Sequence, residues 1–322
     1  MAVCSVTEYR DRVVGQCEKV IVGKRSVIKK VLICFLCGGH ILLQDVPGTG
    51  KTMLLRAFAA TVGGSFKRIQ FTPDLLPSDL TGINFYNQKS GDFQFRPGPI
   101  FSNLVLADEI NRATPRTQSA LLEAMAERQV TVDGETHPMA EPFMIMATQN
   151  PLESHGTFPL PEAQTDRFFM RLSLGYMERA QELSVLTGED SNSLVAALRP
   201  LVSPEDTLAA QQAVSAVEVA PDVADYLMDI VQATREDSQI RIGVSTRGAL
   251  ALYKAAQAAA ALDGRAFVTP EDVKTLAPAV LAHRIVMAVG GKMSESEALI
   301  AKLCDSCRVP TEGKQGSAAA TD

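Results

Sequence analysis

A glycine-rich turn followed by a lysine and a threonine is the first feature of this sequence that could do chemistry. It occupies residues 47–52, between a short apolar segment at 41–43 and a helical pattern that starts at Met53. In a strand–loop–helix unit, glycines let successive backbone N–H groups converge on a phosphate, and the helix N-terminus adds partial positive charge. Lys51 would then contact the β- and γ-phosphate oxygens, and the Thr52 hydroxyl would ligate Mg²⁺. The predicted ATP-binding residues are Pro47, Gly48, Thr49, Gly50, Lys51, Thr52 and Met53.

Asp45 departs from the strict form of this pattern, because it stands where the first glycine is usual. That position precedes the tight part of the loop, so we expect phosphate binding to be retained. The alternative interpretation of the segment is an ordinary glycine-rich turn with a surface lysine. The strand–loop–helix context argues against that alternative.

Two adjacent carboxylates, Asp108 and Glu109, follow the apolar segment 103–107. Acids at the C-terminal end of a buried strand are costly unless a cation or hydrogen bonds satisfy them. Mg²⁺ is the natural partner of Asp108, and Glu109 would orient or deprotonate a water. The alternative explanation for one of the two acids is a helix N-cap.

A polar amide follows the next apolar segment, 143–147, at Asn150. The carboxyl ends of parallel strands share one edge of a sheet, so Asn150 could hold the attacking water there. Asn before Pro is also a common turn element, and this alternative stays open on spacing alone.

Short apolar segments alternate with helical patterns between residues 41 and 169. The expected strands are 41–43, 67–71, 103–107 and 143–147, and the expected helices are 51–62, 114–128 and 160–169. The last two strands are almost continuously apolar, as buried parallel strands are. The alternation predicts an α/β sandwich with a parallel sheet.

Two β-hairpins are expected as insertions in this unit. One spans 82–95 around the turn 89–92, and the other spans 129–136 around Asp133 and Gly134. Asp-Gly between alternating apolar residues is a strong hairpin signal. Insertions on a rigid scaffold commonly contact partners.

The strand signals end at about Arg171. Segments 203–206 and 269–272 each place a hydroxyl N-cap before a proline and two acids, and 250–262 is alanine-rich and helical. We expect three parts, which are an α/β nucleotide-binding domain with the two hairpins at 1–174, an all-helical domain at 175–309 and a disordered tail at 310–322.

The composition limits the classes of function. Of 322 residues, 46 % are hydrophobic and 21 % are charged, and the formal net charge is −6. An acidic chain without a Lys/Arg block is a poor candidate for general nucleic-acid or membrane-surface binding. No apolar run approaches the ~18–20 residues of a membrane helix. Residues 1–14 carry charged side chains at positions 8 and 10–12, where a signal peptide would be apolar. We therefore expect a cytoplasmic protein.

Six cysteines include two C-x-x-C pairs, which raise the alternative of a zinc site. Cys34 and Cys37 lie in an apolar helical run, where a free cysteine behaves as a small hydrophobic residue. Cys304 and Cys307 lie near the polar C-terminal segment. We therefore expect cysteines that pack rather than bind metal.

Together these motifs resemble those of the AAA+ ATPases, and of the MoxR subfamily in particular. The segments that carry the resemblance are DVPGTGKT (45–52), LADEINRA (106–113), TQSALLEAM (117–125), ATQNP (147–151), LPEAQTDRF (160–168) and GVSTR (243–247). The resemblance covers nearly the whole chain. It implies an AAA+ P-loop αβα sandwich followed by a helical lid domain, and the two hairpins look like the helix-2 and pre-sensor-1 insertions of that branch.

The resemblance also implies roles for single residues. Asn150 would be sensor 1, and Arg247, at the start of a helix in the second domain, would be sensor 2. Arg167 looks like the arginine finger that reaches the γ-phosphate of a neighbouring subunit. Val22 and Gly23 resemble the segment that lies along the adenine.

Which arginine acts on the neighbouring subunit stays open, because Arg112 and Arg116 could also face a subunit interface. A finger supplied by a neighbour contributes about 10³–10⁵ in rate in related P-loop enzymes. The isolated subunit is then expected to be nearly inactive, and a ring, a hexamer by family resemblance, would be the enzyme.

The expected function is ATP hydrolysis that remodels or matures a protein partner, since MoxR-like proteins are associated with complex assembly and cofactor or metal insertion. A separate protein with a von Willebrand factor A domain is a candidate partner by the same resemblance. The alternatives are a small-molecule P-loop kinase, disfavoured by the helical second domain and Asn150, and a non-hydrolysing nucleotide switch, disfavoured by Glu109. DNA-acting AAA+ motors are a further alternative.

Overall fold

A sheet of five parallel strands organises the structure. The computed structural model describes residues 5–45, 48–149, 156–188, 190–290 and 293–310. The strands lie in the order β2-β5-β8-β1-β9, and each pairs in parallel with its neighbours. Their bounds are Ile41–Gln44 (β1), Phe66–Gln70 (β2), Leu104–Asp108 (β5), Met144–Gln149 (β8) and Met170–Leu172 (β9). The four predicted strands are confirmed, with ends that differ by at most two residues.

The fifth strand, β9, was not among the four predicted strands. Arg171 lies at the centre of this strand, which is three residues long. A run this short with a charge in the middle does not show the apolar pattern of a buried strand. This strand forms because it pairs with β1, where Met170 and Leu172 lie opposite Ile41 and Leu43.

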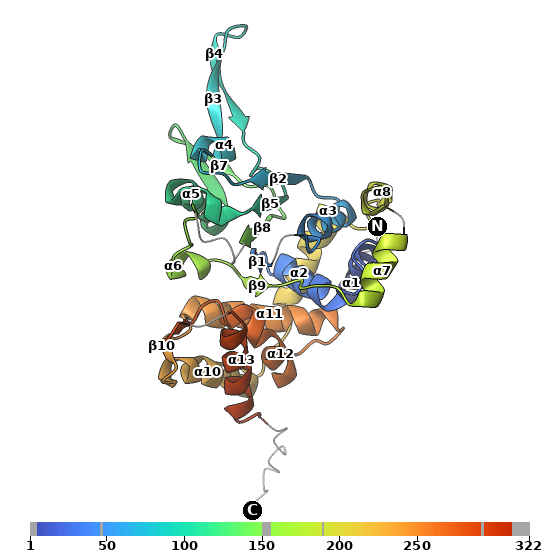
Figure 1. The fold of residues 1–322 in the computed structure, drawn as a ribbon, viewed down its shortest axis with the longest axis vertical. Helices are drawn as coiled ribbons and strands as arrows, with labels where there is room; N and C mark the ends of the chain where they lie inside the picture. Colours follow the sequence, from blue (N-terminus) through green and yellow to red (C-terminus); the bar gives the residue numbers. More distant parts are fainter. Residues whose placement is uncertain (1–4, 46–47, 150–155, 189, 291–292, 311–322) are drawn as a thin grey trace, which may run out of the picture.

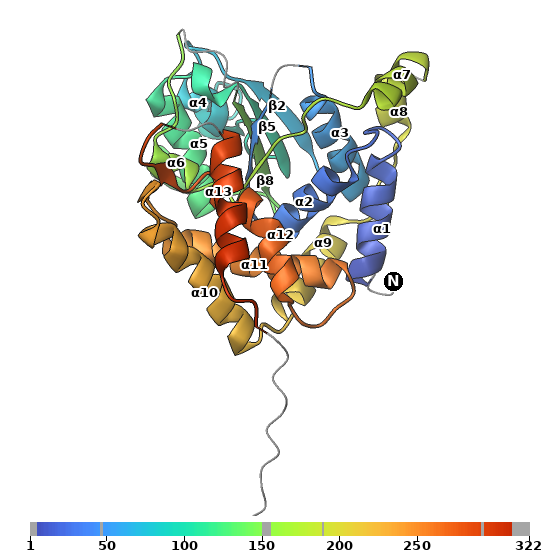
Figure 2. The same cartoon turned by 60° about the horizontal axis from the view of Figure 1, so that its bottom comes forward.

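Helices cover both faces of the sheet (Figures 1 and 2). The first layer is α1 (Val6–Cys17), α2 (Arg25–Leu36) and α3 (Lys51–Val62), and the second is α4 (Pro77–Thr81) and α5 (Pro115–Glu127). Successive strand residues point to different layers. Leu106 and Met146 belong to the first core, whereas Val105 and Ile145 belong to the second. The αβα sandwich is confirmed.

Both predicted hairpins are present. The first is β3 (Gly82–Asn87) with β4 (Asp92–Pro97), and the second is β6 (Gln129–Val132) with β7 (Glu135–Pro138). Asp133 and Gly134 have φ of 50° and 87°, the left-handed values that a two-residue hairpin turn requires. The first hairpin projects far from the body of the molecule (Figure 1).

The chain beyond residue 175 is mainly helical. Its helices are α7 (Arg179–Thr187), α8 (Ser191–Ala197), α9 (Pro204–Ser215), α10 (Pro221–Glu236), α11 (Thr246–Leu262), α12 (Pro270–Leu281) and α13 (Met293–Ser306). Ser203 and Thr269 form the expected capping boxes with Asp206 and Asp272. Among the described residues, no helix combines the length and apolar character needed to cross a membrane.

Two expectations about helices need correction. A short antiparallel pair, β10 (Ile240–Ile242) with β11 (Val286–Met287), lies in the second half, which is therefore not all-helical. The helix expected at 160–169 is limited to α6 (Glu162–Thr165). The residues after α6 form turns, because the chain there must bend into β9. A 3₁₀ turn, η1 (Ile110–Arg112), follows β5.

One apolar core joins the first helical layer to the second half of the chain. Tyr9 Oη and Thr207 Oγ1 are 2.7 Å apart across this contact. Cys34 and Cys304 are buried in the same core, as packing residues would be. The division at residue 174 stays a prediction, and residues 311–322 of the predicted tail lie outside the described residues.

Candidate functional site

The predicted phosphate-binding loop joins β1 to α3. Gly48 and Gly50 have φ of 86° and 87°, which glycine adopts without strain. Gly50 is the N-cap of α3 and provides no side chain there, so the first turn presents its N–H groups to a ligand. A pocket of about 270 Å³ opens at this point, and the residues lining it are Gly48, Thr49, Gly50, Lys51, Thr52, Met53, Arg68, Asp108, Glu109 and Thr148. Pro47 lies outside the described residues.

Asp108 stands at the end of β5 and faces this pocket. Arg68, from the neighbouring strand β2, places Nη2 2.6 Å from Asp108 Oδ2. Thr148 Oγ1 donates to the other carboxylate oxygen at 2.6 Å. The predicted Mg²⁺ ligand is therefore held by a guanidinium and a hydroxyl in this arrangement, and the Arg68 cation balances its charge.

Glu109 has φ of 57° and ψ of 50°, a left-handed conformation that is strained for a residue with a side chain. Its N–H donates to Thr148 Oγ1 at 2.8 Å. Its carboxylate accepts from Gln70 Nε2 at 2.7 Å and pairs with Arg112 Nε at 3.0 Å. Glu109 is the N-cap residue of η1, but its side chain makes no cap bond, so capping does not account for this carboxylate. Strain at a pocket residue is typical of functional sites.

Asp45, the departure from the strict loop pattern, ties the loop to the segment after β9. Its carboxylate accepts hydrogen bonds from Ser173 Oγ at 2.7 Å and from the N–H groups of Leu174 at 2.6 Å and Gly175 at 3.0 Å. Its carbonyl accepts from Lys51 Nζ at 3.2 Å. Asp45 is 5 % exposed, so these are charge-assisted bonds to a buried carboxylate.

We expect Asp45→Gly to lower the free energy of unfolding by about 2–4 kcal/mol, because it removes three charge-assisted bonds and leaves the buried N–H of Leu174 unsatisfied. Urea denaturation followed by circular dichroism measures the change. Asp74→Gly is the matched control, since Asp74 is exposed on a turn, and a shift within about 0.5 kcal/mol is expected there. Equal stability of Asp45→Gly and wild type would contradict this role of the carboxylate.

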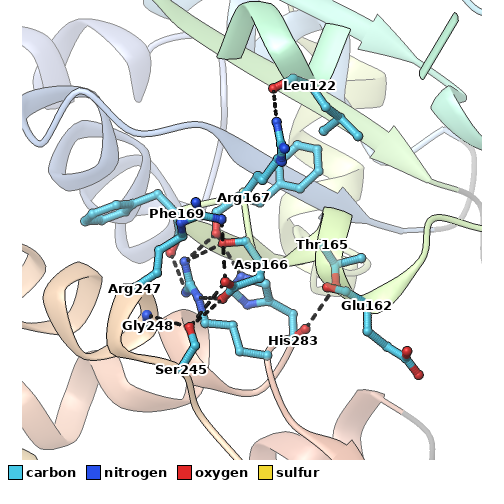
Figure 3. Close-up of polar contacts among 12 residues, drawn as sticks. Leu122, Glu162, Thr165, Asp166, Arg167, Phe169, Ser245, Arg247, Gly248 and His283 are labelled. Atoms are coloured by element: carbon cyan, nitrogen blue, oxygen red, sulfur yellow. Dashed lines mark hydrogen bonds and ion pairs between the residues drawn. The ribbon is translucent and has the colours of Figure 1, made fainter. Parts of the chain in front are cut away.

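Two predicted arginines are absent from the lining of the phosphate pocket, and Figure 3 shows the contacts that they make instead. Nη1 of Arg167 donates to the backbone oxygen of Leu122, in α5, at 2.9 Å. Nη1 of Arg247, in the first turn of α11, pairs with Asp166 Oδ2 at 3.7 Å. The side chain of Arg247 is 58 % exposed, and Arg167 is exposed as well. Both arginines are therefore exposed, and neither lines the pocket.

Comparisons with known proteins agree with these motifs. Residues 40–170 match the ATPase family associated with various cellular activities (AAA), and residues 232–303 match the AAA lid domain. Chaperone MoxR1 of Mycobacterium tuberculosis is 40 % identical over 86 % of this chain and 75 % of the relative. Protein MoxR of Paracoccus denitrificans is 33 % identical over 89 % of this chain and 91 % of the relative. The chain belongs to the MoxR family of AAA+ ATPases.

Two further comparisons cover almost the whole chain. An uncharacterized Bacillus subtilis protein, YeaC, is 48 % identical over 94 % of this chain and 95 % of its own length. A crystal structure of a protein from Cytophaga hutchinsonii, assigned as an ATPase, is similar with a TM-score of 0.84 and 39 % identity, and the match covers 95 % of this chain and 97 % of that one. The sheet and the lid are therefore those of the AAA+ fold.

The site residues predicted for this MoxR-family chain divide into separate groups. The loop residues from Gly48 to Met53 meet Asp108 and Glu109 in one pocket. Arg167 and Arg247 do not line this pocket, and they contact Leu122 of α5 and Asp166, respectively. Asn150 lies outside the described residues, next to Gln149, the last residue of β8.

Val22 and Gly23 lie in the turn between α1 and α2, and neither lines the phosphate pocket. Helix α7 covers this turn. Lys24 Nζ donates to the carbonyl of Tyr176 at 2.8 Å. A Cβ on Gly23, whose φ is 72°, would lie 2.1 Å from Gln181 Nε2. The turn therefore needs glycine for its conformation, whereas the flexible end of the Gln181 side chain could move away from an added Cβ.

Three residues that contact the two acids were missing from the sequence prediction. Arg68 and Gln70 lie on the same face of β2, and β2 pairs directly with β5. The alternation of polar residues at 68 and 70 was a usable signal, but it needs the strand order to have meaning. Thr148 is 1 % exposed and bonds to both Asp108 and Glu109.

Proposed function

We propose that this protein hydrolyses ATP with Mg²⁺ within a ring of identical subunits, and that it uses this cycle to remodel or mature protein complexes. The observation that carries the proposal is the meeting of the glycine loop, Lys51, Asp108 and Glu109 in one pocket of about 270 Å³. A relative that shares 40 % of its residues is named a chaperone, which supports the second half of the proposal.

The pocket fits a triphosphate and a divalent cation. Two glycines at positive φ precede a helix N-terminus, and Lys51 lines the same space. Thr52 and Asp108 provide the oxygen ligands that Mg²⁺ prefers. When bound between them, Mg²⁺ would neutralise charge that develops on the phosphates. In this structure Arg68 balances the charge of Asp108 through an ion pair. Binding of Mg²⁺ to Asp108 would therefore replace this ion pair with a metal contact.

Glu109 is the proposed general base. Its carboxylate would accept a proton from the water that attacks the γ-phosphate, and Asn150 would help to hold that water. Gln70 and Arg112 hold the carboxylate toward β2 in this structure. The bond from Gln70 to Oε2 fixes the orientation of the carboxylate, which makes Gln70 a candidate control on hydrolysis.

The remaining groups of the cycle are proposed from the family resemblance. Arg167 is exposed and outside the pocket of its own subunit, which suits a finger that acts on a neighbour. Arg247 would report the nucleotide state to the lid, and Val22 with Gly23 would lie along the adenine. A separate protein with a von Willebrand factor A domain is the proposed partner in maturation.

The proposal is tested by measuring ATP hydrolysis per subunit across protein concentration, with Glu109→Gln as the blank. A rise in specific activity with concentration is expected, because the site is completed between subunits. Constant activity from a species whose measured mass is that of a monomer would contradict the ring. ATP binding without hydrolysis above the blank would contradict the proposed ATPase activity. The non-hydrolysing nucleotide switch would then be the supported alternative.

The β3–β4 hairpin is the proposed contact with the client protein. Its exposed apolar side chains are Ile83, Phe85, Tyr86 and Phe93, and Phe93 is 73 % exposed. The base is braced, since the rings of Phe95 and His137 stack at 3.9 Å and Asn84 Nδ2 donates to Asp133 at 2.9 Å. A braced arm that exposes apolar side chains on the strands below its polar turn suits binding of exposed apolar segments in another protein.

We expect the double substitution Tyr86→Ser and Phe93→Ser to abolish binding of reduced casein, a probe for unfolded protein, and to leave ATP hydrolysis within about twofold. Both side chains lie near the tip and outside the phosphate pocket. Fluorescence anisotropy of labelled casein measures binding. Phe267→Ser, which changes a phenylalanine that is 56 % exposed on the lid, is the matched control. If the double variant still binds casein, these two side chains are not the contact with the client protein.

A further inference from the structure

The carboxylate of Asp166 lies where the turn before β9 meets the lid helices (Figure 3). It accepts hydrogen bonds from Nε of Arg284 at 3.0 Å and from Oγ of Ser245 at 3.2 Å. Nη1 of Arg247 forms an ion pair with it at 3.7 Å. Three lid residues therefore hold one side chain that belongs to the turn after α6.

Arg284 is the strongest of these partners. Its side chain is 2 % exposed, and burial lowers its pKa to about 10, so it stays charged at neutral pH. Its guanidinium also donates to the carbonyls of Phe168 at 2.7 Å and Phe169 at 3.1 Å. A buried charge of this kind requires a counter-ion and full hydrogen bonding. Asp166 supplies the charge, so the turn and the lid are joined durably at this point.

The contacts at the start of α11 are weaker. Arg247 is 58 % exposed and its ion pair is long, and such surface pairs contribute about 0–1 kcal/mol. Ser245 Oγ is shared, because it also accepts the N–H of Gly248 at 3.3 Å to cap α11. The residue proposed as sensor 2 can therefore exchange Asp166 for another anion at low cost, while Arg284 keeps its hold.

Arg167, the candidate finger, follows Asp166 directly in the chain. The residue on its other side is held too, because His283 Nε2 donates to the carbonyl of Phe168 at 3.0 Å. The side chain of Arg167 itself donates to the carbonyl of Leu122. A group that acts on a reacting phosphate must be placed closely, since an error of about 1 Å can cost about 10²-fold in rate.

We propose that Asp166 is a positioning residue that fixes Arg167 to the lid, so that lid movement sets where the finger meets the neighbouring site. The inference rests on the proposed function, because it takes Arg167 to act in a ring. Arg284 is the permanent anchor of Asp166, and Arg247 is the exchangeable contact that links it to the nucleotide state.

We expect Asp166→Asn to lower kcat by about 10- to 100-fold, with KM for ATP within about twofold. Asp166 does not line the phosphate pocket of its own subunit, so ATP binding should persist. Asp166→Glu keeps the charge and should recover part of the rate. A variant that merely loosens the fold would lose ATP binding and ring mass together with kcat.

Mixing two variants in one ring tests whether Asp166 affects the site of its own subunit or that of the neighbouring subunit. Glu109→Gln subunits lack the base but keep the finger, whereas Asp166→Asn subunits keep the base and misplace the finger. In rings mixed 1:1, activity should rise to about a quarter of wild type, because half of the sites keep Glu109 and half of those face an intact finger. Arg167→Ala mixed with Glu109→Gln is the reference.

Recovery in both mixtures supports the positioning role. Recovery with Arg167→Ala alone overturns it, since Asp166 would then act inside its own subunit. If neither mixture recovers ATP hydrolysis, Arg167 is not the arginine finger, and the positioning role of Asp166 is overturned as well. If Asp166→Asn does not assemble, Ser245→Ala removes one of the bonds without uncovering Arg284, and it is expected to give a smaller loss of kcat that the same mixing recovers. Absence of that recovery overturns the proposal.

Discussion

Arg167→Ala is expected to lower ATP hydrolysis per subunit by about 10³-fold or more, because a finger from a neighbouring subunit contributes about 10³–10⁵ in rate in related P-loop enzymes. The structure suits this role. Arg167 is exposed, lies outside its own phosphate pocket, and among the described residues makes a hydrogen bond to a carbonyl but no ion pair. Its guanidinium can leave Leu122 at little cost, since one exposed hydrogen bond contributes about 0.5–1.5 kcal/mol.

The loss should lie in kcat, with ATP binding and ring mass unchanged, because the finger acts on charge that develops in the transition state. Steady-state hydrolysis and equilibrium binding of a fluorescent ATP analogue separate the two. Arg116→Ala is the matched control, an exposed arginine on the nearby helix α5. If Arg116→Ala were inactive and Arg167→Ala fully active, the finger would be Arg116.

Glu109→Gln is expected to lower kcat by about 10²–10⁴-fold, since this is what a positioned general base contributes. The substitution keeps size and can keep the hydrogen bond with Gln70, so the strained backbone at this position and the fold should survive. What it removes is the ability to take a proton from water. ATP should bind with an affinity within about threefold of wild type, because Lys51 and the glycine loop are untouched.

Single-turnover measurement of phosphate release after saturation with ATP tests this prediction directly. Glu123→Gln, an exposed glutamate on α5, is the control for the loss of one negative charge. Undiminished phosphate release by Glu109→Gln would assign the base to another group and leave Glu109 as an acid that holds Gln70 and Arg112 in place.

The local pattern of the chain determined most of the fold. The strands at β1, β2, β5 and β8, the loop that begins at Gly48, the turn at Asp133 and Gly134, and the capping boxes of α9 and α12 all depend on residues within a few positions of one another. Steric limits on φ, capping bonds and apolar alternation act at that range. The candidate phosphate-binding loop could be located for the same reason, because its residues are contiguous.

What the local pattern could not show are the contacts between strands and between the two halves of the chain. Arg68, Gln70 and Thr148 became part of the site only through the strand order, which places β2 and β8 on either side of β5. Strand order depends on how the whole chain packs, and no short segment records it. The fifth strand has the same origin, because β9 is defined by its pairing with β1.

The long-range bonds of two aspartates could not be predicted from the local sequence either. Asp45 is joined to Leu174 and Asp166 to Arg284, across 129 and 118 positions of the chain. In the sequence each is an ordinary acid beside a recognisable motif. The chain by itself determined the loop, the two acids and the secondary structure, since their physics is local. Tertiary packing alone decided which buried cation or N–H group each remaining acid would meet, because that depends on segments brought together by the core.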